Sequence, residues 1–192
     1  MSASAESWAD KLSKWADKTG NQLLKADSLH SFGMISQERK EFERAEQLYK
    51  KSLKIVEQLE NEHDTASIYH QLGIIAQECK EFERAKQLYK KSIKIFEQLG
   101  DEHDTAITYG QLGSLDLLQG RVEDSGRWFV KSIAAFSKTR DQDRANQVTN
   151  IFSIAYKEAS QSEQRKLKQL WENAGLGPLP DAVAVNDYKD RE

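Results

Sequence analysis

Side chains that could carry chemistry recur along this chain at a fixed interval. His30 and His70 form one such pair, and the segments His63-Asp64 and His103-Asp104 form another. A histidine close to a carboxylate can act as a general base, and histidine with aspartate can bind zinc. The sequence therefore raises two chemical hypotheses, acid–base catalysis and metal binding.

The catalytic hypothesis is not supported by the rest of the sequence. His30 or His70 could be a general base with Glu38 or Glu78, but no nucleophile, glycine-rich phosphate loop or HExxH motif accompanies them. Cys79 is the single cysteine, and a lone thiol at a helix end is more often inert than reactive. We predict that the chain is not an enzyme.

The metal hypothesis fails on distance. One step between neighbouring helix pairs, about 10 Å, should separate His63-Asp64 from His103-Asp104, whereas zinc ligands lie ~2 Å from the ion. We interpret Asp64 and Asp104 instead as N-caps of the helices that follow them. No metal and no cofactor is expected.

The same interval is a property of the whole central part of the chain. Residues 38–66 and 78–106 are identical at 23 of 29 positions when aligned directly, and a period of this length is typical of stacked helical repeats. Each repeat carries a glycine, then a small, a large aromatic and a second small residue, and we expect the glycine to admit a close helix–helix contact. These positions are Gly33, Gly73 and Gly113; Ala45, Ala85 and Ser125; Tyr49, Tyr89 and Phe129; Ser52, Ser92 and Ser132.

This pattern resembles the tetratricopeptide repeat, on the evidence of Leu72-Gly73, Ala85, Tyr89 and Ser92, with Tyr69 three residues before Leu72. The resemblance covers roughly residues 26–158 and implies an all-α fold, a right-handed α-solenoid of antiparallel helix pairs that binds other proteins. The 40-residue repeat is longer than the family's usual unit of about 34 residues and lacks the closing proline. It is similar to the long repeats of kinesin light chains and bacterial signalling proteins, and we expect the extra residues to lengthen the second helix and its loop.

The domain boundaries follow from the repeat phase. We expect an amphipathic capping or docking helix over residues 1–20 and three repeats over residues 21–140. A degenerate fourth repeat or capping pair should occupy residues 141–175, and a polar, disordered tail residues 176–192, with a sticky AVAV motif as an alternative. The N-terminal helix carries Trp8, Leu12 and Trp15 on one face. That face either covers the open end of the first repeat or docks a partner or a second copy.

Candidate binding residues are those of each repeat's first helix that packing does not use, because first helices line the concave side of such arrays. They offer histidines and amides for a peptide backbone, and the third repeat is more apolar. The predicted set is His30, Met34, Gln37, Glu38, Ser67, His70, Gln71, Ile74, Gln77, Glu78, Gln111 and Ser114, with Asp27, Ser31, Ile107, Gly110 and Leu118 beside them.

Composition excludes several partner classes. The 192 residues carry a net charge of −3 with both signs interspersed, so neither nucleic acid nor an anionic membrane is expected as a partner. One cysteine allows no intrachain disulfide and favours a reducing, cytoplasmic location.

Three functional hypotheses remain. The first is a scaffold that holds a protein partner, as a peptide or helical segment, in the concave groove. The second is self-assembly into a homo-oligomer through the tryptophan-bearing terminal helices, and the third is a peptide-sensing regulatory module.

Overall fold

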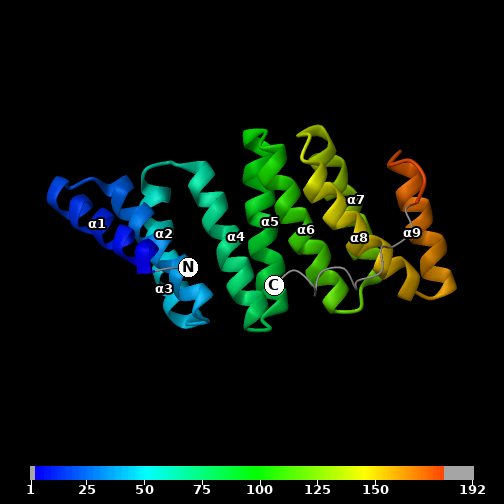
Figure 1. Ribbon diagram of the computed structural model, residues 1–192, viewed down its shortest axis with the longest axis horizontal. Helices are drawn as coiled ribbons and strands as arrows, with labels where there is room; N and C mark the ends of the chain where they lie inside the picture. The colour runs from blue at the N-terminus through cyan, green and yellow to red at the C-terminus, as the bar shows by residue number, and fades with distance from the viewer. Residues whose placement is uncertain (1–2, 180–192) are drawn as a thin grey trace. The chain divides into compact units, whose positions relative to one another are not determined.

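The computed structural model describes residues 3–179, with side chains from Glu6 onward. The expected AVAV motif at residues 182–185 and the rest of the tail from Pro180 lie outside the described residues. Within the described range the chain is all-α, with helices in the order shown in Figure 1. They are α1 (Ala3–Thr19), α2 (Gln22–Glu38), α3 (Phe42–Gln58), α4 (Glu62–Glu78), α5 (Phe82–Leu99), α6 (Glu102–Leu118), α7 (Val122–Lys138), α8 (Gln142–Glu158) and α9 (Gln161–Asn173).

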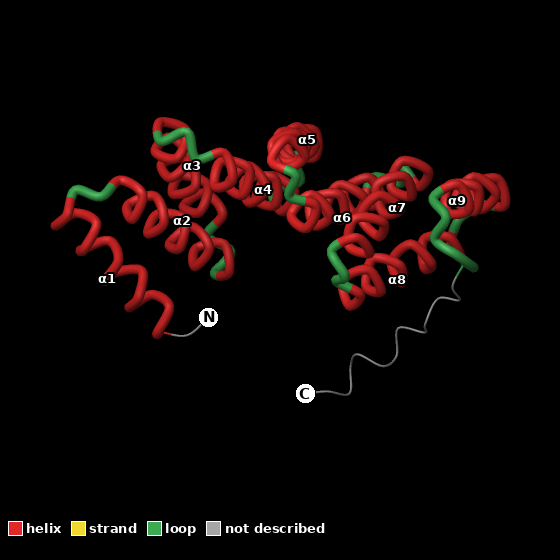
Figure 2. The backbone as a smooth tube through the Cα atoms, turned by 90° about the horizontal axis from the view of Figure 1, so that it is seen from above, coloured by secondary structure: helices red, strands yellow, loops and turns green. Residues whose placement is uncertain are grey.

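The helices are joined by short turns (Figure 2). The turns share a residue in the left-handed region at regular spacing, at Gly20, Lys40, Glu60, Lys80, Gly100, Gly120 and Arg140. In the turn after α4, Lys80 has a φ of 61° and the Glu81 amide donates to the Ala76 carbonyl, as in a Schellman cap.

The expectation of a longer second helix is wrong. The two halves of a repeat are nearly equal, 17 residues in α4 and 18 in α5.

Residues that were expected to lengthen the loop begin the first helix of the next pair instead. Asn61 and Asp101 are the N-caps of α4 and α6, and their side chains accept hydrogen bonds from the amides of Asp64 and Asp104. The prediction that Asp64 and Asp104 are the caps is therefore wrong by three residues. Glu62 and His63 already have helical geometry, so the helix starts before Asp64.

The described chain divides into a first unit that ends at Gly100 and a second unit that starts at Asp101. In the first unit α2 pairs with α3 and α4 with α5, around a core that includes Ala26, Tyr49 and Ile68. A Cβ atom built on Gly73 would lie 2.6 Å from Cε1 of Tyr89. The predicted close contact at the repeated glycine is thereby confirmed.

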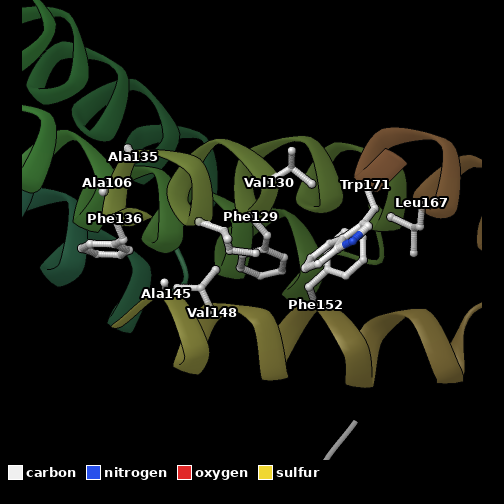
Figure 3. Close-up of a cluster of buried hydrophobic side chains, with 11 residues drawn as sticks. Ala106, Phe129, Val130, Ala135, Phe136, Ala145, Val148, Phe152, Leu167 and Trp171 are labelled. Carbon is white, nitrogen blue, oxygen red and sulfur yellow. The ribbon is translucent and has the colours of Figure 1, made fainter. Parts of the chain in front are cut away.

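The second unit contains α6 to α9, and its core is shown in Figure 3. Phe129 and Phe136 of α7 lie beside Val148 of α8, and Phe152 packs against Trp171 of α9 with ring centroids 5.1 Å apart. Trp171 also donates from Nε1 to the Gly177 carbonyl oxygen, and Leu176 and Leu179 pack against the same core. The first residues of the expected tail are thus held by α9.

Helix α1 covers α2, but through a different face from the one expected. Ala9 and Ala16 are buried, whereas Trp8 and Trp15 are 59% and 57% exposed. Glu6 forms an ion pair with Arg39 at 2.6 Å. Alanines pack closely on a neighbouring helix, so the prediction that the tryptophan face covers the first repeat is wrong.

Candidate functional site

The candidate residues lie on the first helix of each pair, which we call the leading helix: α2 and α4 in the first unit, α6 and α8 in the second. All residues of the predicted set are at least partly exposed. The structure nevertheless divides them into residues that hold their own helix pair together and residues that are available to a partner.

Gln37 and Gln77 belong to the first group. The Tyr49 hydroxyl donates to Oε1 of Gln37 at 2.8 Å, and the Tyr89 hydroxyl donates to Oε1 of Gln77 at 3.1 Å. Burial raises the pKa of both tyrosines, so the phenols stay protonated and remain donors. These two amides therefore tie a leading helix to its pair in the first unit.

His30 and His70 are packed in the same way. Their rings lie 5.5 Å and 5.7 Å from the rings of Tyr49 and Tyr89, measured between centroids. Burial lowers the pKa of His30 and lowers that of His70 to about 4. Both imidazoles are neutral at pH 7 and fill the space over the central tyrosine of their repeat.

The surface of the first unit between α2 and α4 is acidic. Burial raises the pKa of Asp27, and the nearby Asp64 carboxylate raises it further. Glu38 and Glu78 are exposed at the C-terminal ends of the same helices. This face would attract a partner segment that carries positive charge.

The second unit contains a cleft of about 430 Å³ between its leading helices α6 and α8. From α6 come the expected residues Ile107, Gly110, Gln111 and Ser114; the remaining lining is Phe129 and Phe136 of α7 and Arg144, Gln147, Val148 and Ile151 of α8. Leu118, also expected, lies outside this lining. The cleft combines an apolar floor with amide, hydroxyl and guanidinium groups, as is usual for ligand sites.

Gly110 explains why the cleft is open. Residue 110 stands at the phase that His30 and His70 occupy in the two preceding repeats. A Cβ atom at Gly110 would meet only Oγ of Ser132 at 3.4 Å and Cγ2 of Val148 at 3.9 Å. Among the described residues, no imidazole therefore lies over Phe129, which corresponds to the tyrosines of the other repeats.

Four lining residues of α8 were missed by the sequence analysis. Gln147 and Ile151 lie one repeat period after Ile107 and Gln111, so the repeat phase could have found them. The fourth repeat lacks the glycine and the small residues that mark this phase in the first three repeats. Arg144 is held by Asp141, whose Oδ2 lies 3.4 Å from its Nε.

The irregular third repeat is stabilised by three coordinated changes. Asp116 is fully buried and accepts hydrogen bonds from Arg121, at 2.9 Å from Nε, and from Nε1 of Trp128 at 3.0 Å. The preceding repeat has alanine, glutamate and leucine at these three positions. Because each polar group satisfies another, the buried carboxylate is compensated.

The remaining chemical candidates are His63, His103 and Cys79. His63 packs edge-on against Phe96, and His103 packs against Phe136, with centroids 5.5 Å and 5.7 Å apart. Cys79 is exposed, and desolvation together with nearby carboxylates, Glu81 first among them, raises the pKa of its thiol. A thiol with a raised pKa is a poor nucleophile at neutral pH.

Within residues 3–179, every helix is too short or too polar to span a lipid bilayer.

Comparison with known proteins agrees with this architecture. Two sequence models of the tetratricopeptide repeat match residues 26–64 and 64–138, which together are more than half of the chain. A search of curated proteins gave no match.

Solved structures give the same fold. BtubC (BKLC) from P. vanneervenii has a TM-score of 0.67 at 20% identity, over 85% of this chain and 69% of that one. Two structures named for kinesin light chain TPR-like repeats from Podosopora anserina have TM-scores of 0.64 and 0.63 at 12% and 14% identity. Each match covers 90% of this chain, and the matches cover 85% of the first of these structures and 86% of the second. The chain belongs to the tetratricopeptide repeat family.

Proposed function

We propose that this protein is a non-catalytic cytoplasmic scaffold that binds an extended segment of a partner protein through its leading helices. Tetratricopeptide repeats are in general protein–protein interaction modules. The observation that carries the proposal is the cleft between α6 and α8, which lies on the surface where the repeat phase predicts binding residues.

The chemistry of the cleft suits a peptide. Ile107 and Ile151 offer apolar contact, whereas Gln111 and Gln147 can both donate to and accept from a peptide backbone. A floor of apolar side chains supplies affinity, and a few polar groups fix the register. In the first unit, the acidic face at Asp27 favours basic residues in a bound segment.

The test is a peptide library displayed on phage and selected against the whole chain, followed by affinity measurement for the peptides recovered. Ile151→Glu places a charge in the cleft and should weaken binding at least tenfold. Leu99→Glu is the control, because Leu99 is exposed at the end of α5, a second helix, and lies outside the cleft lining. Equal loss in both variants, or recovery of no peptide at all, would contradict the proposal.

A second candidate function, self-assembly, is favoured by the exposed Trp8 and Trp15 of α1. In α9, the last described helix, Trp171 is only 3% exposed. Any contact should therefore join two α1 helices rather than one end to the other. Light scattering over a hundredfold concentration range tests this: a constant monomer mass would exclude it, whereas a dimer should become monomeric with Trp8→Ala and Trp15→Ala.

A further inference from the structure

We propose that the cleft of the second unit is a socket for one aromatic side chain of the partner protein. The inference rests on the proposed binding function and adds the chemical class of the group that is recognised.

In each of the first two repeats a ring from the leading helix packs over the central aromatic residue. His30 lies over Tyr49 and His70 over Tyr89, at nearly the same centroid distance. At this position of the repeat the fold therefore accommodates a planar ring, and in the first two repeats that ring is a histidine of the leading helix.

The third repeat keeps the central aromatic residue, Phe129, but has Gly110 in place of the histidine. The space that opens at this phase is part of the cleft. An aromatic side chain of the partner would take the place of the missing imidazole. Edge-to-face and offset contacts between aromatic rings add to the binding free energy that burial alone supplies.

The charge of the cleft also favours an aromatic occupant. Among the described residues that line it, Arg144 is the one with a charged side chain, and a guanidinium is attracted to the negative face of an aromatic ring. An aliphatic side chain could fill the same volume but has no such face. Gln111 and Ser114 stand near Gly110 on α6 and can hold the adjoining peptide backbone.

Two substitutions at position 110 distinguish binding of an aromatic side chain in the socket from binding elsewhere on the surface. Gly110→His restores the ring that the other repeats carry and should close the socket. Gly110→Ala is the control, because its Cβ makes only ordinary contacts. Both replace a helical glycine, so both should raise the melting temperature, and lost binding cannot then be ascribed to unfolding.

The experiment uses the peptides selected by phage display on the whole chain. Peptides that bind should be enriched in Phe, Tyr or Trp at one position. Replacing that residue by Leu should weaken binding at least tenfold, Gly110→His should do the same, and Gly110→Ala should change it less than threefold. Peptides that bind without an aromatic residue, or equally well to Gly110→His, would overturn the socket and leave the scaffold function intact. Failure to select any peptide would overturn both.

Discussion

At the scale of single residues, the repeats allow equivalent positions to be compared inside one molecule. Ser52 and Ser92 are both buried on the second helix of a pair, at equivalent positions of neighbouring repeats. The Ser52 hydroxyl donates to the Ala26 carbonyl oxygen at 2.8 Å, whereas Oγ of Ser92 has no hydrogen-bond partner among the described residues. The same residue type at the same phase therefore has two different energetic roles.

We predict that Ser52→Ala lowers the free energy of unfolding by about 1 kcal/mol, the usual net value of one buried hydrogen bond. Ser92→Ala should be neutral or slightly stabilising, because it removes a buried polar atom that is unsatisfied. Urea unfolding of the two variants gives both values. Equal losses would show that the two hydroxyls are in fact equivalent.

At the scale of the elements, the turns oppose folding to different extents. Gly100 and Gly120 supply left-handed residues without steric strain, but Lys40, Lys80 and Arg140 adopt the same conformation with a Cβ atom. A non-glycine residue in this region costs roughly 1–2 kcal/mol. The turns that contain lysine or arginine therefore offset part of the stability of their helix pairs.

Lys80→Gly should stabilise the chain by about 0.5–1 kcal/mol, since relief of the left-handed strain exceeds the added entropy of the unfolded glycine. Gly120→Lys is the reverse change at an equivalent turn and should destabilise by a similar amount. Thermal unfolding of the pair measures both shifts. Shifts of the melting temperature in the same direction for both variants would show that left-handed strain does not limit the stability of these turns.

The docking of α9 on α7 depends on the absence of a side chain at Gly126. A Cβ atom at Gly126 of α7 would lie 2.2 Å from Cδ2 of Leu167 and 3.5 Å from Cε2 of Phe152. Gly126→Val should therefore push α9 away from α7, and hydrogen exchange of residues 161–173 should accelerate at least tenfold. A smaller residue at the clash, in the double variant Gly126→Val with Leu167→Ala, should restore part of the protection. Unchanged exchange in Gly126→Val would contradict this account.

At the scale of the whole chain, the sequence predicted the fold class and the tight packing at Gly73 because the repeat period and the small-residue marks determine them. It misplaced the starts of α4 and α6 because Asn61 and Asp64 are both good caps and only geometry chooses between them. The cleft was half predicted. Its α6 side follows from the repeat phase, whereas Arg144 and Ile151 lie in a repeat whose marks have diverged.

The stability of the whole chain should fall as the solution becomes mildly acidic, because buried histidines are packed in the neutral form. The pKa of His70 is lowered to about 4 and that of His30 is lowered as well, whereas both return to about 6.5 on unfolding. Their contribution is thus fully present above pH 6.5 and is lost as the pH falls toward the folded pKa, since the unfolded chain takes up protons first.

For His70 alone the expected loss between pH 7.5 and pH 5 is about 2 kcal/mol. Urea unfolding at these two pH values measures the loss. Both values lie above the range in which the carboxylates of Glu46 and Glu123 become protonated, because ion pairs lower the pKa of these two groups. His70→Gln should remove most of the dependence. The control is Gln71→Ala, which changes the neighbouring residue of the same helix and removes no titratable group, and it should leave the dependence unchanged. If both variants keep the full pH dependence of the free energy of unfolding, the neutral packing of His70 does not limit stability in acid.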